Sequence, residues 1–170
     1  MALPFDLLNE EVENAHLPSG EAFEAHAQPP SEDAVGTLLR ALVGAERPLI
    51  LTGPVQNASR ARGALKLLAD AVDAPVVALE SPRGLRDPSL GVFTEAMGRA
   101  DVVVSIGKNI DFTTGFGRAP SMSGSCTFLM VDPDTELLDR ARRAMGARMV
   151  LGVQADAPAT VRKLIEAGSG

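Results

Sequence analysis

The amino-acid sequence predicts an α/β fold in which one parallel sheet lies between two layers of helices. From residue 31 onward, short apolar runs alternate with segments whose apolar residues recur at helical spacing. The apolar runs are nearly continuous, which is typical of strands buried on both faces. Parallel strands joined by helices imply right-handed crossovers. We therefore expect a Rossmann-like three-layer domain, with a parallel sheet of five to six strands and helices on both faces.

The predicted elements follow one another in a regular order after Ser31. This serine is suited to cap the first helix, whose apolar residues share one broad face through Val43. Residues 48–53 are an apolar run bounded by proline and glycine and predict the first strand, and the apolar spacing at 61–72 predicts a second helix. The remaining predicted elements are strands at 75–79, 101–106, 126–131 and 148–153 and helices at 94–99, 135–145 and 158–167.

The arrangement of the strands is also predicted. We expect the strand at 48–53 to lie at the centre of the sheet, and residues 90–93 are a candidate for a short extra strand. With that strand counted third, the strand order is 3-2-1-4-5-6, an order found in doubly wound sheets.

The composition argues against several classes of protein. The 170 residues include 16 Lys and Arg against 22 Asp and Glu, a formal net charge of −6, so no basic field attracts nucleic acid. No apolar run approaches the roughly 20 residues that span a bilayer. The first residues lack a cationic region followed by a long apolar stretch, and the single cysteine cannot form an internal disulfide. We expect a cytoplasmic protein with neither nucleic acid nor a membrane as partner.

Residues 1–30 differ from the rest of the chain. They contain both histidines, several prolines and an acidic cluster at Glu10, Glu11 and Glu13. We interpret residues 1–30 as an interdomain linker that leaves a missing upstream domain, and residues 31–170 as the globular domain.

Ligands of open parallel sheets bind beyond the carboxyl ends of the strands, so the residues that follow each strand are candidates. Gly53 permits a tight turn, and the helix that begins near Asn57 offers free amides to a phosphate. The alternative is that Gly53 only ends a strand. Asp132 and Asp134 are placed to accept hydrogen bonds from ribose hydroxyls, although Asp134 is equally suited to cap the next helix.

Two basic residues and one long loop extend these candidates. Lys108 and Arg83 would neutralise a diphosphate, or would simply be solvated. Asp111 lies in a Gly- and Ser-rich loop at 107–125, which is long enough to be functional or merely mobile.

The sequence contains none of the common catalytic or metal-binding motifs. Neither G-x-G-x-x-G nor G-x-x-x-x-G-K-[ST] occurs, and His16 and His26 have no cysteine partner for zinc. Cys126 opens an apolar strand and is expected to be a small buried hydrophobe. We assign no catalytic residue and no metal ligand to this chain.

Residues 48–167 resemble the central domain of thiamine-diphosphate-dependent enzymes, the group that includes acetolactate synthase, benzaldehyde lyase and oxalyl-CoA decarboxylase. The matching segments are RPLILTG at 47–53, LLA at 67–69, APVV at 74–77, ADVVVSIG at 100–107 and VDPD at 131–134. Residues 2–6 resemble the segment that leaves the preceding pyrimidine-binding domain in such enzymes. The segments at 80–84 and 111–112 look closer to the lyases and decarboxylases than to the biosynthetic synthases.

The resemblance implies a thiamine-diphosphate- and magnesium-dependent enzyme acting on 2-keto acids or acyloins, assembled as a homodimer or homotetramer. In this family the cofactor and Mg²⁺ are bound by other domains, through a G-D-G motif and a catalytic Glu, and the G-D-G tripeptide is absent here. The implied partners of this chain are therefore the missing pyrimidine-binding and diphosphate-binding domains. We expect the chain alone to be inactive.

The resemblance also implies positions that face a nucleotide, because the central domain binds FAD or ADP in some members. Pro54 removes an amide donor and Asn109 stands where an arginine is expected, so ADP is favoured over FAD. The alternatives are a stand-alone FAD-, ADP- or NAD-binding module and a nucleotide-free oligomerisation domain. The implied cofactor-binding positions are Gly53, Pro54, Arg83, Gly84, Gly107, Lys108, Asn109, Asp111, Asp132, Asp134, Ala155 and Asp156.

Overall fold

The computed structural model describes residues 11, 18–24, 26–53, 59–79 and 87–169. Over these residues the chain alternates strands and helices as predicted. None of the helices in this part of the chain is both long and apolar enough to cross a bilayer. The elements are α1 (Glu32–Val43), β1 (Pro48–Thr52), α2 (Ser59–Val72), β2 (Val76–Ala78), α3 (Phe93–Arg99), β3 (Val102–Ile106), β4 (Thr127–Val131), α4 (Thr135–Met145), β5 (Met149–Val153) and α5 (Ala157–Gly168), with 3-10 turns η2 (Gly20–Phe23), η5 (Pro88–Leu90), η6 (Phe112–Gly117) and η7 (Gly146–Arg148).

The five described strands form one parallel sheet in the order β2-β1-β3-β4-β5. This is the predicted order of the five main strands, and the parallel α/β class is confirmed. The expectation that β1 lies at the centre was wrong, because β3 is the middle strand once the extra strand is missing from the other edge. β1 is an interior strand that pairs with β2 on one side and β3 on the other.

The candidate extra strand at 90–93 does not form. Pro88–Leu90 make a 3-10 turn, Gly91 has a φ of +56°, and Phe93 is already the first residue of α3. The left-handed backbone at Gly91 breaks the extended conformation that a strand requires.

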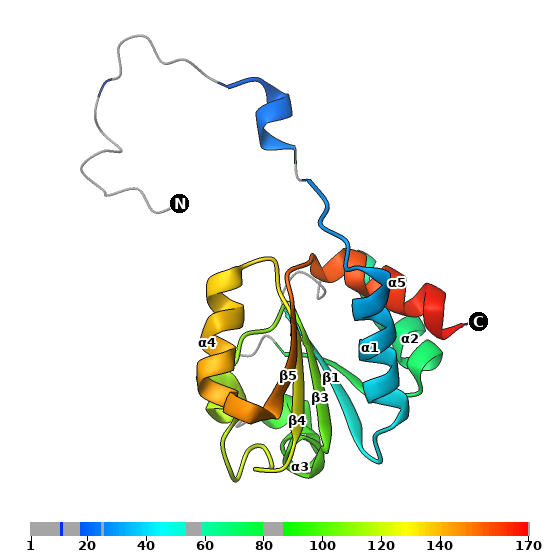
Figure 1. Cartoon of the computed structure of the whole chain (residues 1–170), viewed down its shortest axis with the longest axis vertical. Coiled ribbons are helices and arrows are strands. Elements are labelled where there is room, and N and C mark those ends of the chain that lie inside the picture. Colours follow the sequence, from blue (N-terminus) through cyan, green and yellow to red (C-terminus); the bar gives the residue numbers. More distant parts are fainter. Residues whose placement is uncertain (1–10, 12–17, 25, 54–58, 80–86, 170) are drawn as a thin grey trace.

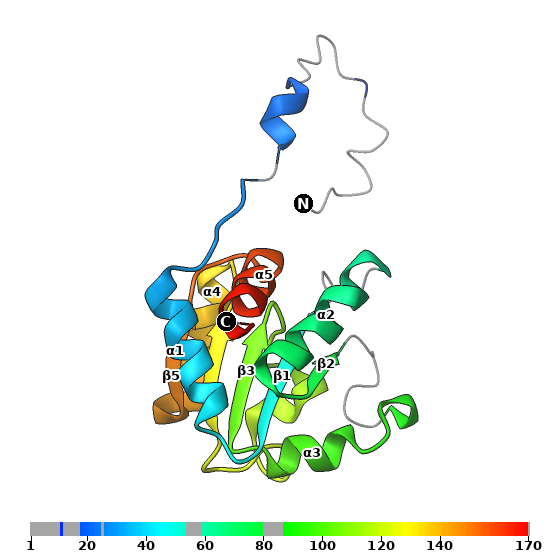
Figure 2. The same ribbon diagram turned by 90° about the vertical axis from the view of Figure 1, so that its right-hand side faces the viewer.

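Helices cover both faces of the sheet, and each face has its own core (Figures 1 and 2). Helices α1, α2 and α5 pack on one face, where Leu38 and Leu164 are fully buried against Val104. Helices α3 and α4 lie on the other face with Met97, Phe128 and the fully buried Cys126. Alternate residues of each strand point into the two cores, which is why the strands are apolar at most positions, with Thr52 and Ser105 as buried polar exceptions.

The segment that precedes α1 leaves the domain at the edge where the strands end (Figure 1). Because α1 runs antiparallel to the strands, its first residue lies at their carboxyl ends. Ser31 caps α1 by accepting a hydrogen bond from the Ala34 amide, as predicted. Pro30 is buried, whereas residues 26–29 are exposed.

A close backbone contact joins the ends of β1 and β3. The Gly53 amide donates to the Ile106 carbonyl at 3.2 Å, and a Cβ at position 53 would lie 1.7 Å from the Gly107 carbonyl oxygen. Gly107 itself has a φ of +65°. Position 53 therefore requires glycine because of this close approach.

We predict that Gly53→Ala destabilises the domain by about 3 kcal/mol or more, because the new methyl group meets backbone atoms that cannot rotate away. Chemical denaturation followed by circular dichroism measures this change. Gly63→Ala is the matched control, because a Cβ there meets nothing within 4 Å. In the helix α2 this control should stabilise by about 0.5–1 kcal/mol. Equal effects of the two substitutions would contradict the assigned contact.

Candidate functional site

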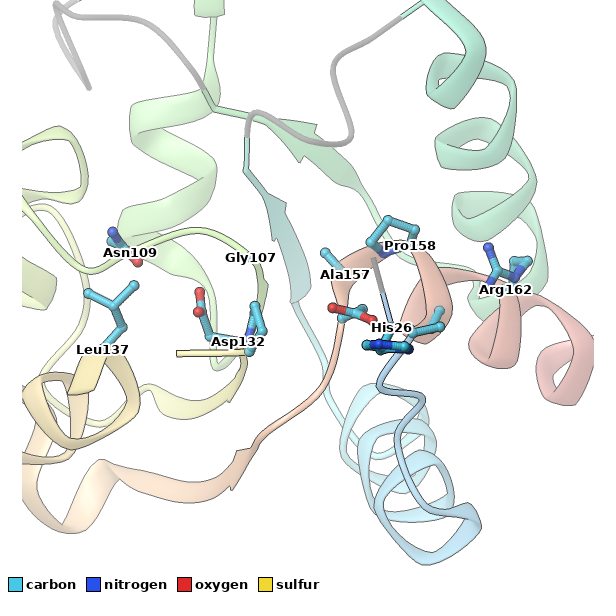
Figure 3. A pocket seen from close by; sticks show the side chains of 12 residues that line it. His26, Gly107, Asn109, Asp132, Leu137, Ala157, Pro158 and Arg162 are labelled. Atoms are coloured by element: carbon cyan, nitrogen blue, oxygen red, sulfur yellow. The ribbon is translucent and has the colours of Figure 1, made fainter. Parts of the chain in front are cut away.

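A cavity of about 610 Å³ opens at the carboxyl ends of β3, β4 and β5 (Figure 3). Its walls come from the turns after these strands, from the first turns of α4 and α5, and from the segment before α1. A volume of this size is typical of small-molecule sites. The lining residues are His26, Ala27, Gly107, Asn109, Asp132, Pro133, Leu137, Asp156, Ala157, Pro158, Ala159 and Arg162.

Four of the residues predicted from the sequence meet in this cavity: Gly107, Asn109, Asp132 and Asp156. They come from three different loops and are brought together because parallel strands end at the same edge. The predicted role of these residues in binding a ligand stays a prediction.

Asp132 is the buried charge of the site. Its side chain and backbone are only 5 % exposed, and Oδ1 accepts a hydrogen bond from the Asp134 amide at 2.9 Å. The second oxygen, Oδ2, has no donor among the described residues. Burial raises the pKa of the Asp132 carboxyl. The hydrogen bond from the Asp134 amide lowers this pKa and the negative charge of the Asp134 side chain raises it, and the net shift is upward. Burial of the Asp132 carboxylate therefore costs free energy of folding, and its second oxygen can still accept a hydrogen bond from a molecule in the cavity (Figure 3).

The start of α5 forms the opposite wall. Asp156 occupies the N-cap position, but its side chain makes no capping hydrogen bond. Its carboxylate instead accepts from the Gln28 amide at 2.5 Å, and its own amide donates to the Gln28 carbonyl at 2.8 Å. Arg162 lines the same wall and has no ion-pair partner in the described part of the chain. The wall therefore combines a helix N-terminus with one free cation.

Three other predicted residues have structural roles. Asp134 caps α4 by accepting from the Glu136 amide at 2.8 Å, which confirms the capping interpretation. Ala155 is fully buried and its amide donates to the Asp132 carbonyl, while Gly53 packs on Gly107 outside the cavity lining. Pro54, Arg83 and Gly84, together with Asn57 at the expected phosphate site, lie outside the described residues.

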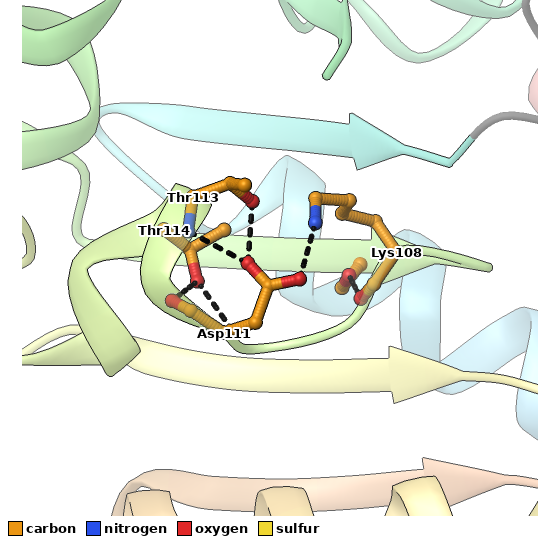
Figure 4. Close-up of polar contacts among 5 residues, drawn as sticks. Lys108, Asp111, Thr113 and Thr114 are labelled. Atoms are coloured by element: carbon orange, nitrogen blue, oxygen red, sulfur yellow. Dashed lines mark hydrogen bonds and ion pairs between the residues drawn. The ribbon is translucent and has the colours of Figure 1, made fainter. Parts of the chain in front are cut away.

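Lys108 and Asp111 form an internal ion pair rather than part of the cavity lining (Figure 4). Lys108 is 6 % exposed, and its Nζ lies 3.1 Å from Asp111 Oδ2. Asp111 Oδ1 accepts hydrogen bonds from the amide and hydroxyl of Thr113, at the start of η6. Burial acts to raise the pKa of Asp111, but the hydrogen bonds from Thr113 and Lys108 outweigh it and hold the pKa below its usual range. The charge of Lys108 is therefore used to fix the loop after β3.

Sequence reasoning missed His26, Leu137, Pro158 and Arg162. Leu137 and Arg162 lie on helices, where their spacing indicates only an ordinary helix face. His26 was assigned to the linker, and no local signal shows that the linker returns to the carboxyl edge of the sheet. The Asp-Ala-Pro sequence at 156–158 was the available hint, since it marks a helix start at that edge.

We predict that Lys108→Met lowers the free energy of unfolding by about 1–2 kcal/mol at pH 7. Removing one partner of a fully buried ion pair lowers the free energy of unfolding by more than this. The smaller effect is expected here because about a third of the Asp111 side chain is exposed to solvent. The lowered pKa of Asp111 means that its ionisation stabilises the fold above about pH 4 and ceases to do so as pH falls through the folded-state pKa. Lys66→Met, which breaks the exposed pair with Asp70, is the control and should change stability by less than about 0.5 kcal/mol. Denaturant titrations at several pH values compare the two.

We predict that Asp132→Asn stabilises the domain by about 1 kcal/mol at pH 7, because it removes a buried charge and keeps the acceptor for the Asp134 amide. The folded-state pKa of Asp132 is raised, so its charge costs nothing below the unfolded value near 3.9 and costs most above the folded value. The advantage of Asp132→Asn should disappear as pH falls below about 4. A thermal unfolding series over pH that shows the variant less stable at neutral pH would contradict this assignment.

The family model of the thiamine pyrophosphate enzyme central domain matches residues 35–164. The 2-hydroxyacyl-CoA lyase of Arabidopsis thaliana is 28 % identical over 158 residues, which are 87 % of this chain and 26 % of the plant protein. The chain therefore spans about a quarter of the curated relative that it matches.

Solved structures agree on the fold. A thiamine-diphosphate-dependent 4-hydroxybenzoylformate decarboxylase from Rhodococcus jostii superposes with a TM-score of 0.59 at 22 % identity, over 95 % of this chain and 29 % of that one. Benzoylformate decarboxylase from Polynucleobacter necessarius gives a TM-score of 0.60 at 16 % identity, over 96 % and 31 % of the two chains. With the family match over most of its length, this chain belongs to the thiamine pyrophosphate enzyme central-domain family.

Proposed function

We propose that this chain is the central domain of a magnesium-dependent lyase or decarboxylase that acts on 2-keto acids or acyloins. The similar plant protein is a 2-hydroxyacyl-CoA lyase, and a 2-hydroxyacyl group carries a hydroxyl next to a carbonyl, as an acyloin does. The two structural neighbours named above are decarboxylases. These names support the proposed class of reaction, and the family itself supplies the thiamine diphosphate dependence.

The residues that the structure describes do not fit thiamine diphosphate or Mg²⁺. No group of three or more His, Cys, Asp or Glu suited to a metal occurs among the described residues, and the sequence has no G-D-G tripeptide. We therefore propose that neighbouring pyrimidine-binding and diphosphate-binding domains hold both, in a homodimeric or homotetrameric enzyme. In this proposal the isolated chain has no catalytic activity.

The function that the geometry of this domain supports best is binding of an adenine nucleotide, ADP in preference to FAD. The observation that carries this proposal is the nearly buried Asp132 at a cavity of about 610 Å³, whose Oδ2 accepts from no donor in the part of the chain that the structure describes. Ribose hydroxyls are suitable donors for such a carboxylate. The residues suit this group, because Leu137, Pro133 and Ala157 supply apolar surface beside the acceptor.

The cavity suits the nucleoside half of the ligand better than its phosphates. Two carboxylates, Asp132 and Asp156, line it together with a single cation among the described residues, Arg162, so the negative charge of the lining exceeds the positive charge and disfavours an anion. We propose that the phosphates leave the cavity past Gly107 and Asn109, toward Gly53. Asn109 offers a neutral amide there, so a charge-assisted contact to the diphosphate is missing at this position.

Calorimetric titration of the chain tests the proposal. We predict that ADP binds more tightly than FAD, and that thiamine diphosphate with Mg²⁺ gives no heat of binding. Asp132→Asn should weaken ADP binding about tenfold, since loss of one hydrogen bond to a charged group costs about 1.4 kcal/mol or more.

Two results would overturn this proposal. One is FAD binding more tightly than ADP, and the other is specific binding of thiamine diphosphate by the chain alone. Because Asp132→Asn is expected to stabilise the fold, weaker ADP binding by that variant cannot be attributed to unfolding. Unchanged ADP affinity in Asp132→Asn would remove Asp132 from the site.

A further inference from the structure

The segment before α1 is attached to the site by two hydrogen bonds. The Gln28 amide donates to the Asp156 carboxylate, and the Asp156 amide donates back to the Gln28 carbonyl. Two residues later Pro30 is buried, and Ser31 caps α1. We call residues 26–30 the N-terminal strap. It is held at the start of α5 and at the start of α1, although most of its surface is exposed.

A comparison of two aspartates shows that this attachment replaces an ordinary helix cap. Asp134 and Asp156 occupy the N-cap positions of α4 and α5, which begin at the same edge of the sheet. Asp134 accepts from an amide of its own helix, whereas Asp156 makes no side-chain cap and binds the strap. A cap contributes about 1 kcal/mol to a helix. Binding of the strap thus takes the place of an interaction that is available locally.

The strap forms one wall of the cavity. His26 and Ala27 line it together with Asp132 and with Ala157 and Pro158 of α5 (Figure 3). His26 makes no hydrogen bond within the described part of the chain, so its imidazole ring is available to a ligand. A planar ring and an alanine on one wall, and alanine and proline on another, provide apolar surfaces for a flat heterocycle beside a ribose acceptor.

We propose that the N-terminal strap is part of the binding site and closes over the base of a bound adenine nucleotide, with His26 in contact with the base. This inference rests on the nucleotide binding proposed above. Bound nucleotide then contacts both the strap and α5, so it favours the attached strap. By linkage, the attached strap raises nucleotide affinity by the same factor.

Substitutions at Gln28 test the strap without altering the cavity lining. Gln28→Pro removes the amide that donates to Asp156 and leaves Asp156 in place. Gln28→Ala keeps that amide and is the matched control. Hydrogen exchange of the Asp156 amide, which donates to the Gln28 carbonyl, should be faster in Gln28→Pro than in wild type and unchanged in Gln28→Ala. Equal exchange in all three would overturn the attachment.

Titration with ADP tests the contribution to binding. We expect ADP to slow exchange in the strap of the wild-type chain, and Gln28→Pro to bind ADP about tenfold more weakly than Gln28→Ala, a difference of about 1.4 kcal/mol. His26→Ala should also weaken binding, whereas Glu24→Ala, outside the cavity lining, should not.

The outcomes separate this inference from the function on which it rests. If wild type binds ADP and Gln28→Pro and His26→Ala bind it equally well, the strap is not part of the site and the proposed nucleotide binding stands. If wild type binds no ADP, the proposed nucleotide binding fails and this inference fails with it. Slower exchange of the strap together with weaker binding by both variants supports the inference.

Discussion

The backbone contact between Gly53 and Gly107 sets the geometry of the whole carboxyl edge. β1 and β3 lie where the chain changes direction across the sheet, with β2 on one side and β4 and β5 on the other. The Gly53 amide is bonded to the end of β3, and the Gly107 amide to the end of β4 at 2.8 Å. Three strand ends are therefore linked in series by backbone atoms. These hydrogen bonds fix the distances between the strand ends, and therefore between the loop residues after β3 and β4 that line the cavity.

The elements of the fold were predictable where the residues that begin and end an element agree with its apolar spacing. α4 was predicted at its observed bounds because Asp134 caps its start and Gly146, with a φ of +57°, ends it. The candidate strand at 90–93 was wrong because a short apolar run does not reveal a left-handed glycine. The prediction that β1 is the central strand was wrong for the same reason, because without the extra edge strand β3 lies in the middle of the sheet.

The site was predictable only in the part that strand ends define. Asp132 and Asp156 follow strands, and the topology alone brings them to one edge. Lys108 also follows a strand, but its charge pairs with Asp111 three residues later. The sequence alone does not show whether such a lysine binds a ligand phosphate or forms an internal ion pair. His26 belongs to the site through the path of the strap, which depends on a hydrogen bond between residues 128 positions apart.

The attachment of Gln28 to Asp156 also has a mechanical consequence. Tension applied to the chain before residue 26 is carried first by these two hydrogen bonds, and reaches the Ser31 cap of α1 only after they break. The load therefore falls on the start of α5 and spares the sheet, where the strands are held by many hydrogen bonds in parallel. Under tension these two hydrogen bonds break before the core unfolds, so movement of the preceding chain can detach the strap and leave the domain folded.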